Sequence, residues 1–444
     1  MPVDLSPAGP RMALPTRRLR LLPCLFGWIL FCGVGAALVL LLWPRAVPAH
    51  GAWFWICLLG IPNGVFIGAL IIARIAYEAD CLYAVFRNRH RAAWLSGRVR
   101  AAQRPLQVLG AGYCLPLEGK SVGEVLAAKA SLLEARVPRS GIGRVQHSRF
   151  TGDDPLFGDY SNEFSSADRV SEDAPDVGLF DGTSRIMATV PPVVHVISRA
   201  LAPVVDSIRV LSQYGPQYAP VVRVLSKSGP EDARVSHVRQ ALERVGLPGL
   251  DCAAVPATEG LMPVDAWLDA TERRPLLLVA AEFHDAPPSG STEGAVAVLL
   301  GSGAFELPEP VKATALLHRP AADEIEYLDA VLANAVLWGN TDPATVGTAW
   351  LSGLDGTYDT RLLAALRRAG MSALVNDDVQ RRPDRFIGHA GAAGGWMSVA
   401  AAFEEGGGTH VILHAPSSVS TVQAAILHVN DQVNNQELHD ERTQ

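Results

Sequence analysis

Cysteine and histidine are the residue types here with the widest chemical range, and their spacing excludes several kinds of site. The six cysteines lie at positions 24, 32, 57, 81, 114 and 252, with no CxxC pair and no metal-like spacing. The twelve histidines are spread without ligand spacing as well. Zinc sites and disulfide frameworks need such clusters. We therefore expect no metal, no structural disulfide and no resident cofactor.

Nucleophile and phosphate motifs are equally sparse. The sequence has no GxSxG turn of the kind that exposes a catalytic serine. Gly110-Ala-Gly112 lacks a third glycine, and Pro116 and Glu118 do not suit a phosphate-binding loop. No spaced ligand loop for calcium surrounds Asp153 and Asp154. The net charge of -7 gives no reason to expect nucleic acid as a partner.

Two uncharged stretches near the N-terminus predict membrane helices. Residues 21–43 and 52–73 are each about one bilayer span in length. Pro44, Arg45 and Pro48 break the chain between them, which predicts a helical hairpin over residues 21–73. A cleaved signal peptide would share the basic start, but the length of the first stretch and the presence of the second argue against it.

Arginines flank this hairpin on one side. The connecting loop has only Arg45, whereas the chain before and after the hairpin carries Arg11, Arg17, Arg18, Arg20, Arg74, Arg87, Arg89, Arg91, Arg98 and Arg100. Positive residues stay in the cytoplasm. We expect a bacterial inner-membrane protein with both termini cytoplasmic. Residues 1–20 form a basic N-terminal segment, and residues 74–104 form a basic juxtamembrane helix that acts as an electrostatic anchor or, alternatively, binds a partner.

From residue 105 onward, strands and helices alternate. Strands are predicted at 106–110, 193–197, 221–225, 276–280, 295–300, 313–317, 346–351 and 411–414. A turn is predicted at 111–119, and helices at 121–135, 236–245, 262–270, 323–337, 360–369 and 396–404. Ser121 and Glu124 have the spacing of a capping box at the first of these helices. Strands that are apolar throughout indicate an α/β body whose sheet is covered on both faces.

Residues 151–181 interrupt this pattern with nine acidic residues and one basic residue, Arg169. Such a segment is a solvated insertion or a docking segment for a basic partner. The candidate partner-binding residues are Asp153, Asp154, Phe157, Tyr160, Phe164 and Phe180. Residues 431–444 form a polar tail.

Three motifs occur in an order that resembles thiolase-like proteins, the ketoacyl-synthase group in particular. They are Val108-Leu-Gly-Ala-Gly-Tyr-Cys-Leu-Pro116 with Lys120-Ser-Val-Gly-Glu124, Thr292-Glu-Gly-Ala-Val-Ala-Val298, and Ile387-Gly-His-Ala-Gly-Ala-Ala-Gly394. The resemblance implies a duplicated five-layer αβαβα fold over residues 105–430, which form the soluble domain. It places His389 at a position that helps to stabilise developing charge in a working synthase.

The other catalytic positions that the resemblance implies are degenerate. The run before the predicted helix 262–270, where a nucleophilic cysteine belongs, contains Thr258, and Cys252 lies a few residues too early for activation at a helix N-terminus. The strand-end motif that carries a second histidine in the family reads Leu354-Asp-Gly-Thr-Tyr358 here, with Asp355 in place of the histidine. A lysine is missing from Arg382-Pro-Asp-Arg385, and a glycine-rich loop is replaced by Ala415-Pro-Ser-Ser-Val419. Because acyl transfer needs a complete set of groups, we expect a retained fold with lost chemistry.

A membrane-anchored, degenerate thiolase-like protein is similar to the adaptor family that serves lipase effectors of the bacterial type VI secretion system. This resemblance implies a non-enzymatic adaptor or chaperone whose partners are a lipase effector and the secretion spike protein, and it leaves self-association open. The alternatives are a membrane-bound acyl-transferring enzyme with Cys252 as its nucleophile, and a scaffold of another envelope complex.

Overall fold

The computed structural model describes residues 5–15, 21–44, 48–140, 142–151, 190–226, 231–270, 273–303, 307–416 and 420–430. The chain divides into two compact units, and the boundary falls within one long helix after Arg98. Apart from Thr151, the acidic insertion 151–181 lies outside the described residues, as does the polar tail 431–444.

The first unit holds the predicted hairpin. It contains a 3₁₀ turn at Ser6–Ala8, α1 (Leu21–Leu42), α2 (Ala52–Trp55), a π-helical turn (Ile56–Gly60) and α3 (Ile61–Ala102). Two helices of this unit are long and apolar enough to cross a membrane. Phe31 of α1 contacts Phe66 of α3, with ring centroids 6.1 Å apart. Most of the predicted second span and almost all of the predicted juxtamembrane helix lie in α3, and no proline or glycine interrupts the chain between residues 69 and 96.

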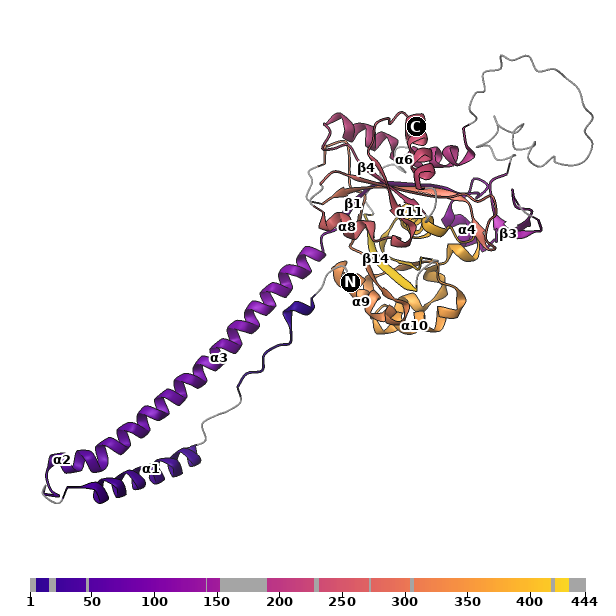
Figure 1. The fold of residues 1–444 in the computed structure, drawn as a ribbon. Coiled ribbons are helices and arrows are strands. Elements are labelled where there is room, and N and C mark those ends of the chain that lie inside the picture. Colours follow the sequence, from indigo (N-terminus) through magenta and orange to yellow (C-terminus); the bar gives the residue numbers. More distant parts are fainter. Residues whose placement is uncertain are drawn as a thin grey trace, which may run out of the picture. The chain divides into compact units, whose positions relative to one another are not determined.

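The second unit is an α/β body (Figure 1). The strands of its N-terminal half are β1 (Leu106–Cys114), β4 (Val221–Ser226), β5 (Cys252–Pro256), β6 (Leu276–Glu282) and β8 (Gly294–Ser302). Those of its C-terminal half are β9 (Ala315–Leu317), β11 (Thr348–Ser352), β12 (Gln380–Arg381), β13 (Gly408–His414) and β14 (Thr421–Val429). A short strand, β10 (Ala321–Glu324), pairs with β14, and β2 (Glu134–Arg136), β3 (Val145–Ser148) and β7 (Ser291–Thr292) form a small separate sheet.

The two halves repeat one topology. Their strands lie in the order β5-β4-β6-β8-β1 and β12-β11-β13-β14-β9. When the five strands of each half are numbered along the chain, both orders read 3-2-4-5-1. In each half the fifth strand is antiparallel to its two neighbours. The first strands of the two halves, β1 and β9, pair antiparallel. The predicted duplication is therefore confirmed.

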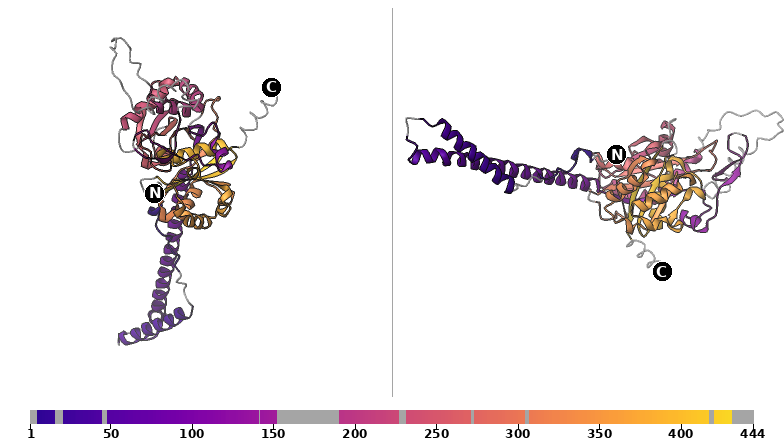
Figure 2. Two further views of the ribbon diagram at one scale, coloured as in Figure 1. Left: turned by 90° about the vertical axis from the view of Figure 1, so that its right-hand side faces the viewer. Right: turned by 90° about the horizontal axis from the view of Figure 1, so that it is seen from below.

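Helices separate and cover the two half-sheets. They are α4 (Val122–Ala128), α6 (Pro192–Gln213), α7 (Glu231–Arg244), α8 (Pro263–Asp269), α9 (Leu328–Trp338), α10 (Asp359–Arg368) and α11 (Gly394–Glu405). Successive side chains of a strand point to opposite faces, so Leu276 and Leu278 of β6 enter a core shared with α8, α11 and strands of both halves. Leu277 and Val279 enter a second core under α6 and α7. Figure 2 shows the N-terminal half in magenta and the C-terminal half in orange to yellow.

Several predicted elements differ from the structure. Residues 193–197 are not a strand but the start of α6, because an apolar run of this length also fits a buried helix, and the apolar spacing continues through Leu201, Val204 and Ile208. The predicted turn at 111–119 begins late, since β1 continues to Cys114. The predicted helix 121–135 ends at Ala128, after which Lys129 adopts a left-handed conformation. The predicted helix 323–337 begins only at Leu328, after β10.

Candidate functional site

The turn that leads into α8 lies where the resemblance places a nucleophile. Gly260 occupies this turn with φ +53°. A Cβ atom on Gly260 would lie 2.5 Å from Oε1 of Gln423 and 2.9 Å from Cδ2 of His414. Both the backbone conformation and the neighbouring atoms therefore exclude a side chain at this position.

Side chains from the C-terminal half hold this turn in place. The Leu261 N–H donates to Oε1 of Gln423 at 2.7 Å, and Nε2 of Gln423 donates to the Glu259 carbonyl at 2.9 Å. The indole N–H of Trp396 donates to the Gly260 carbonyl at 2.8 Å. The site is thus filled by a packed polar clamp between the halves. Sequence reasoning missed Gln423, because more than 160 residues separate it from the turn that it binds.

Cys252 and Thr258 do not meet at this turn. Cys252 is the first residue of β5 and is buried, whereas the carboxyl end of the strand, Pro256, lies four residues and ~13 Å further on. Burial raises the pKa of the Cys252 thiol above its ordinary value, and Arg239 opposes this shift only in part. Thr258 lies in the 3₁₀ turn Ala257–Glu259 and is exposed.

His389 keeps an accessible imidazole. Its side chain is 46% exposed, and its Nδ1 lies 3.0 Å from Oδ2 of Asp384. The same carboxylate oxygen accepts the Gly353 N–H at 2.6 Å, at the end of β11. Hydrogen bonding to Asp384 raises the pKa of His389 above its ordinary value, although burial opposes the shift. The backbone of His389, rather than its side chain, joins the two halves, because its N–H donates to the Gly290 carbonyl at 2.7 Å and its carbonyl accepts the Thr292 N–H at 3.0 Å.

Asp355 lies close enough to His389 for their charges to interact, but it has a local structural role. Asp355 is exposed and caps the 3₁₀ turn Gly356–Tyr358 by accepting hydrogen bonds from the backbone N–H and the hydroxyl of Thr357. These bonds hold the pKa of Asp355 below its ordinary value. Asp355 therefore contributes negative charge near His389 rather than a proton-transfer group.

The entry to the buried helix α11 is occupied by a carboxylate of the protein itself. Oε1 of Glu282, at the end of β6, accepts the Ala392 N–H at 2.8 Å. Oε2 of Glu282 lies 3.1 Å from Nε2 of His284. Gly391 has φ +52°, and a Cβ atom there would lie 2.5 Å from Glu282. Glu282 thus occupies the helix N-terminus, where an anionic ligand would otherwise bind.

His414, at the end of β13, is buried. Its Nδ1 pairs with the Ser352 hydroxyl at 3.0 Å, and burial lowers its pKa to about 4. A neutral, buried imidazole of this kind stabilises the packing of Gly395, whose position leaves no room for a Cβ atom. The sequence contains one signal for a buried histidine here, because His414 is the last residue of a strand that was predicted to be buried.

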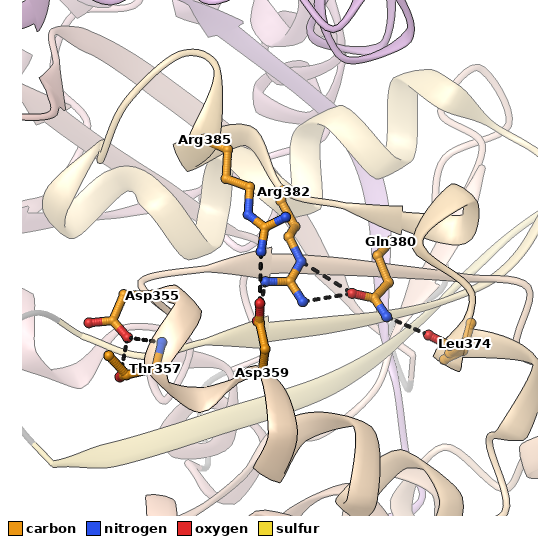
Figure 3. Close-up of polar contacts among 7 residues, drawn as sticks. All are labelled: Asp355, Thr357, Asp359, Leu374, Gln380, Arg382 and Arg385. Atoms are coloured by element: carbon orange, nitrogen blue, oxygen red, sulfur yellow. Dashed lines mark hydrogen bonds and ion pairs between the residues drawn. The ribbon is translucent and has the colours of Figure 1, made fainter.

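Two arginines brace the loop that carries Asp384 (Figure 3). Arg382 pairs with Oδ1 of Asp359 at 2.5 Å, and Arg385 pairs with Oδ2 of the same carboxylate at 2.9 Å. Nη2 of Arg382 also donates to Oε1 of Gln380 at 2.8 Å, and Gln380 donates to the Leu374 carbonyl at 2.8 Å. These bonds fix the run Arg382–Arg385, where the resemblance implies a lysine, as a structural element.

A cleft of about 690 Å³ adjoins this loop and α4. Its charged lining residues are Lys129, Arg381, Arg382, Arg385, Glu124, Asp377, Asp378 and Glu405. Acidic and basic groups are balanced, and Arg381, Arg382 and Arg385 each have a carboxylate partner. The cleft therefore does not form an anion-binding cradle. No group of side chains suited to a metal ion occurs among the described residues.

Among the degenerate positions, His389 has a carboxylate partner in Asp384. The turn at Gly260, where the resemblance places a nucleophile, is filled by the clamp of Gln423 and Trp396. The candidate partner-binding residues Asp153, Asp154, Phe157, Tyr160, Phe164 and Phe180 lie outside the described part of the chain.

Comparisons with known proteins agree with this topology. No protein-family model and no curated protein matches the chain. The ketosynthase domain OzmH KS7 from Streptomyces albus JA3453 aligns with 74% of this chain and 74% of its own, with a TM-score of 0.50 and 11% identity. A ketosynthase from module 1 of the bacillaene synthase of Bacillus amyloliquefaciens FZB42 aligns over 73% and 76% of the two chains, with a TM-score of 0.49 and 13% identity. For 3-oxoacyl-(acyl-carrier-protein) synthase III from Aquifex aeolicus VF5 the shares are 73% and 98%, with a TM-score of 0.41 and 11% identity. At such identities the likeness concerns the fold alone, and the α/β body of this chain has the thiolase-like fold.

Proposed function

We propose that the protein is a membrane-tethered, non-enzymatic adaptor that uses a thiolase-like body to bind another protein. The observation that carries the proposal is the turn at Gly260. A synthase needs a nucleophile at the entry to this helix, and here Gln423 and His414 leave no space for one. A base without a nucleophile cannot form an acyl-enzyme. The fold then serves as a rigid binding surface.

The proposed cargo rests on a family resemblance, and the proposed location rests on the charge pattern of the sequence. The two apolar helices support anchorage in a membrane, and the arginines on both sides of the hairpin favour a bacterial inner membrane with both termini and the body in the cytoplasm. The similarity to type VI secretion adaptors supports a lipase effector as cargo, which the adaptor would deliver to the secretion spike. The acidic insertion 151–181 is the proposed contact for a basic face of that cargo.

An acyl-transferring enzyme is the second candidate. It would require Cys252 as nucleophile, but that thiol is buried at the amino end of β5, and its raised pKa disfavours the reactive thiolate. A scaffold of another envelope complex would use the same anchor and body. It differs from the adaptor in the identity of its partner.

Loss and rescue of secretion tests the proposal. In a strain that lacks the gene, a type VI lipase effector should remain in the cell, and the wild-type chain and Cys252→Ala should both restore its export. Export that does not depend on the gene would contradict the adaptor role. Rescue by the wild type but not by folded Cys252→Ala would favour the enzyme.

A further inference from the structure

One face of α3 is covered along most of its length in the first unit. Near the start of the helix, Phe66 contacts α1. Further along, the N-terminal segment 5–15 binds the same face. Asn88 exchanges two hydrogen bonds with the Met12 backbone at 2.9 and 2.8 Å, and Nε of Arg91 donates to the Gly9 carbonyl at 2.7 Å. Ala84 beneath this segment is fully buried.

Among the described residues, nothing covers the opposite face of α3, which is apolar. It is defined by residues alternately three and four positions apart, which we call the α3 seam: Val65, Gly68, Ile72, Ile75, Ala79, Leu82 and Phe86. At ~100° per residue, this row lies about half a turn from Ala84. Ile75, Leu82 and Phe86 are 60%, 56% and 62% exposed. Apart from the adjoining helix backbone, no atom of the described residues lies within 4 Å of the place that a Cβ atom would take on Gly68.

The seam has the spacing of a left-handed coiled coil. Apolar residues that repeat every 3.5 positions over three heptads favour a parallel helix partner over a flat surface. The seam covers 22 residues, which is ~33 Å of helix. It begins within the predicted bilayer span and continues beyond Arg74, where Ile75, Leu82 and Phe86 would otherwise face water.

The chemistry of the seam selects a second copy of this chain as its occupant. A partner must present a matching apolar row both inside the bilayer and beyond it, in the same register. A second copy in the same membrane carries the same apolar row. Its α3 runs parallel to that of the first copy, with the seam at the same depth in the bilayer. Across such a parallel pair, Glu78 of one copy faces Tyr83 of the other, and Val85 faces His90, so that no like charges meet beside the seam. The next position in the repeat is Arg89, which ends the seam because two arginines would face each other there.

We propose that the protein is a parallel homodimer held together by the α3 seam. This inference rests on the proposed membrane anchorage and not on the adaptor role. Gly68 allows close approach of the helices within the bilayer, and Ile75, Leu82 and Phe86 bury apolar surface outside it. Dimerisation would place two thiolase-like bodies on one anchor.

Cysteine cross-linking in native membranes tests the seam directly, and the chain supplies its own control. Cys81 neighbours Leu82 in sequence but lies ~100° away around the helix. Two full-length chains are compared after Cys24, Cys32 and Cys57 are changed to alanine: one keeps Cys81, and the other carries Cys81→Ala with Leu82→Cys. After mild oxidation, the Leu82→Cys chain should run as a disulfide-linked dimer, and the chain with Cys81 should not. Equal cross-linking of both chains, none in either, or linkage to a protein of different mass would overturn the proposal.

A matched charge substitution gives an independent measurement. In detergent, light scattering should report twice the chain mass for the wild type and for Cys81→Glu, and a single chain mass for Leu82→Glu. A monomeric wild type, or a Leu82→Glu variant that stays dimeric, would refute the seam. Extraction of membranes at high pH separates the two claims: a chain released from the membrane refutes the anchorage, whereas a retained monomer refutes only the dimer.

Discussion

Nδ1 of His389 lies 3.0 Å from a carboxylate oxygen of Asp384, and the same oxygen accepts the Gly353 N–H. One carboxylate therefore joins the glycine-histidine loop to the end of β11. The resemblance to synthases implies a lysine in the run that Asp384 occupies. Asp384, in that run, pairs with His389 instead, while the imidazole stays 46% exposed.

The Asp384–His389 pair predicts a pH-dependent contribution to stability. Since the folded-state pKa of His389 is raised, its contribution is fully present below the unfolded pKa of ~6.5 and is lost as pH rises through the folded pKa. His389→Gln should therefore lower the melting temperature more at pH 5.5 than at pH 8.5. The corresponding free energy should be less than about 1 kcal/mol, because nearly half of the side chain is exposed. Thermal unfolding of the detergent-solubilised chain at both pH values measures this difference, and a larger loss at pH 8.5 would contradict the assignment.

The capping box at α4 predicts a local stability effect. The Ser121 hydroxyl accepts the Glu124 N–H at 3.1 Å, and the Glu124 carboxylate accepts the Ser121 N–H at 2.8 Å. Ser121→Ala should destabilise the body by ~1 kcal/mol. Ser212→Ala is the matched control, because Ser212 is exposed within α6 and alanine suits a helix. Denaturant unfolding should separate the two variants, and equal midpoints would argue against the cap.

Burial of Cys252 predicts an inert thiol. Because the thiolate is the reacting species and burial raises the pKa of Cys252, this thiol in the folded chain at pH 8 should react with iodoacetamide more slowly than a free thiol does. Denaturation should restore ordinary reactivity. Peptide mass spectrometry of labelled chains measures both rates. Fast labelling of the native chain, or an acyl adduct on Cys252 from cells, would support the acyl-transferring enzyme over the adaptor.

Local signals account for much of what the sequence predicted correctly. The apolar run at Leu276 predicted β6 because a strand buried on both faces has no polar positions. The run at Val193 failed for the same reason, since continuous apolar sequence does not distinguish a buried strand from a buried helix. Strand β14, with Gln423 and two adjacent alanines, was missed because its burial depends on pairing with β13 and β9 rather than on its own pattern.

In the candidate site, too, features set by local sequence were predicted and features set by tertiary packing were missed. His389 was found from a short motif. Glu282 and Gln423 were missed, because their partners, Ala392 and Leu261, are brought to them only by the packing of one half of the body against the other. The clamp around Gly260 is therefore a property of the folded duplication that no single stretch of sequence contains.

The acidic insertion predicts a kinetic effect on cargo binding. Deleting residues 151–181 should slow association with the cargo and reduce the salt dependence of the association rate, because surface charge acts mainly by steering. Surface plasmon resonance on the full chain, at two salt concentrations, measures both rates. Unchanged rates, with circular dichroism confirming a folded body, would remove the insertion from the binding surface.

The central claim is that a thiolase-like body without acyl-transfer chemistry captures a protein cargo. Affinity capture of the full chain from its native cells, followed by mass spectrometry of the bound proteins and of Cys252, tests both parts at once. The account predicts a co-purified lipase effector, retained in equal amount by Cys252→Ala, with an unmodified Cys252 in the wild type. An acylated Cys252 without a lipase partner would contradict it.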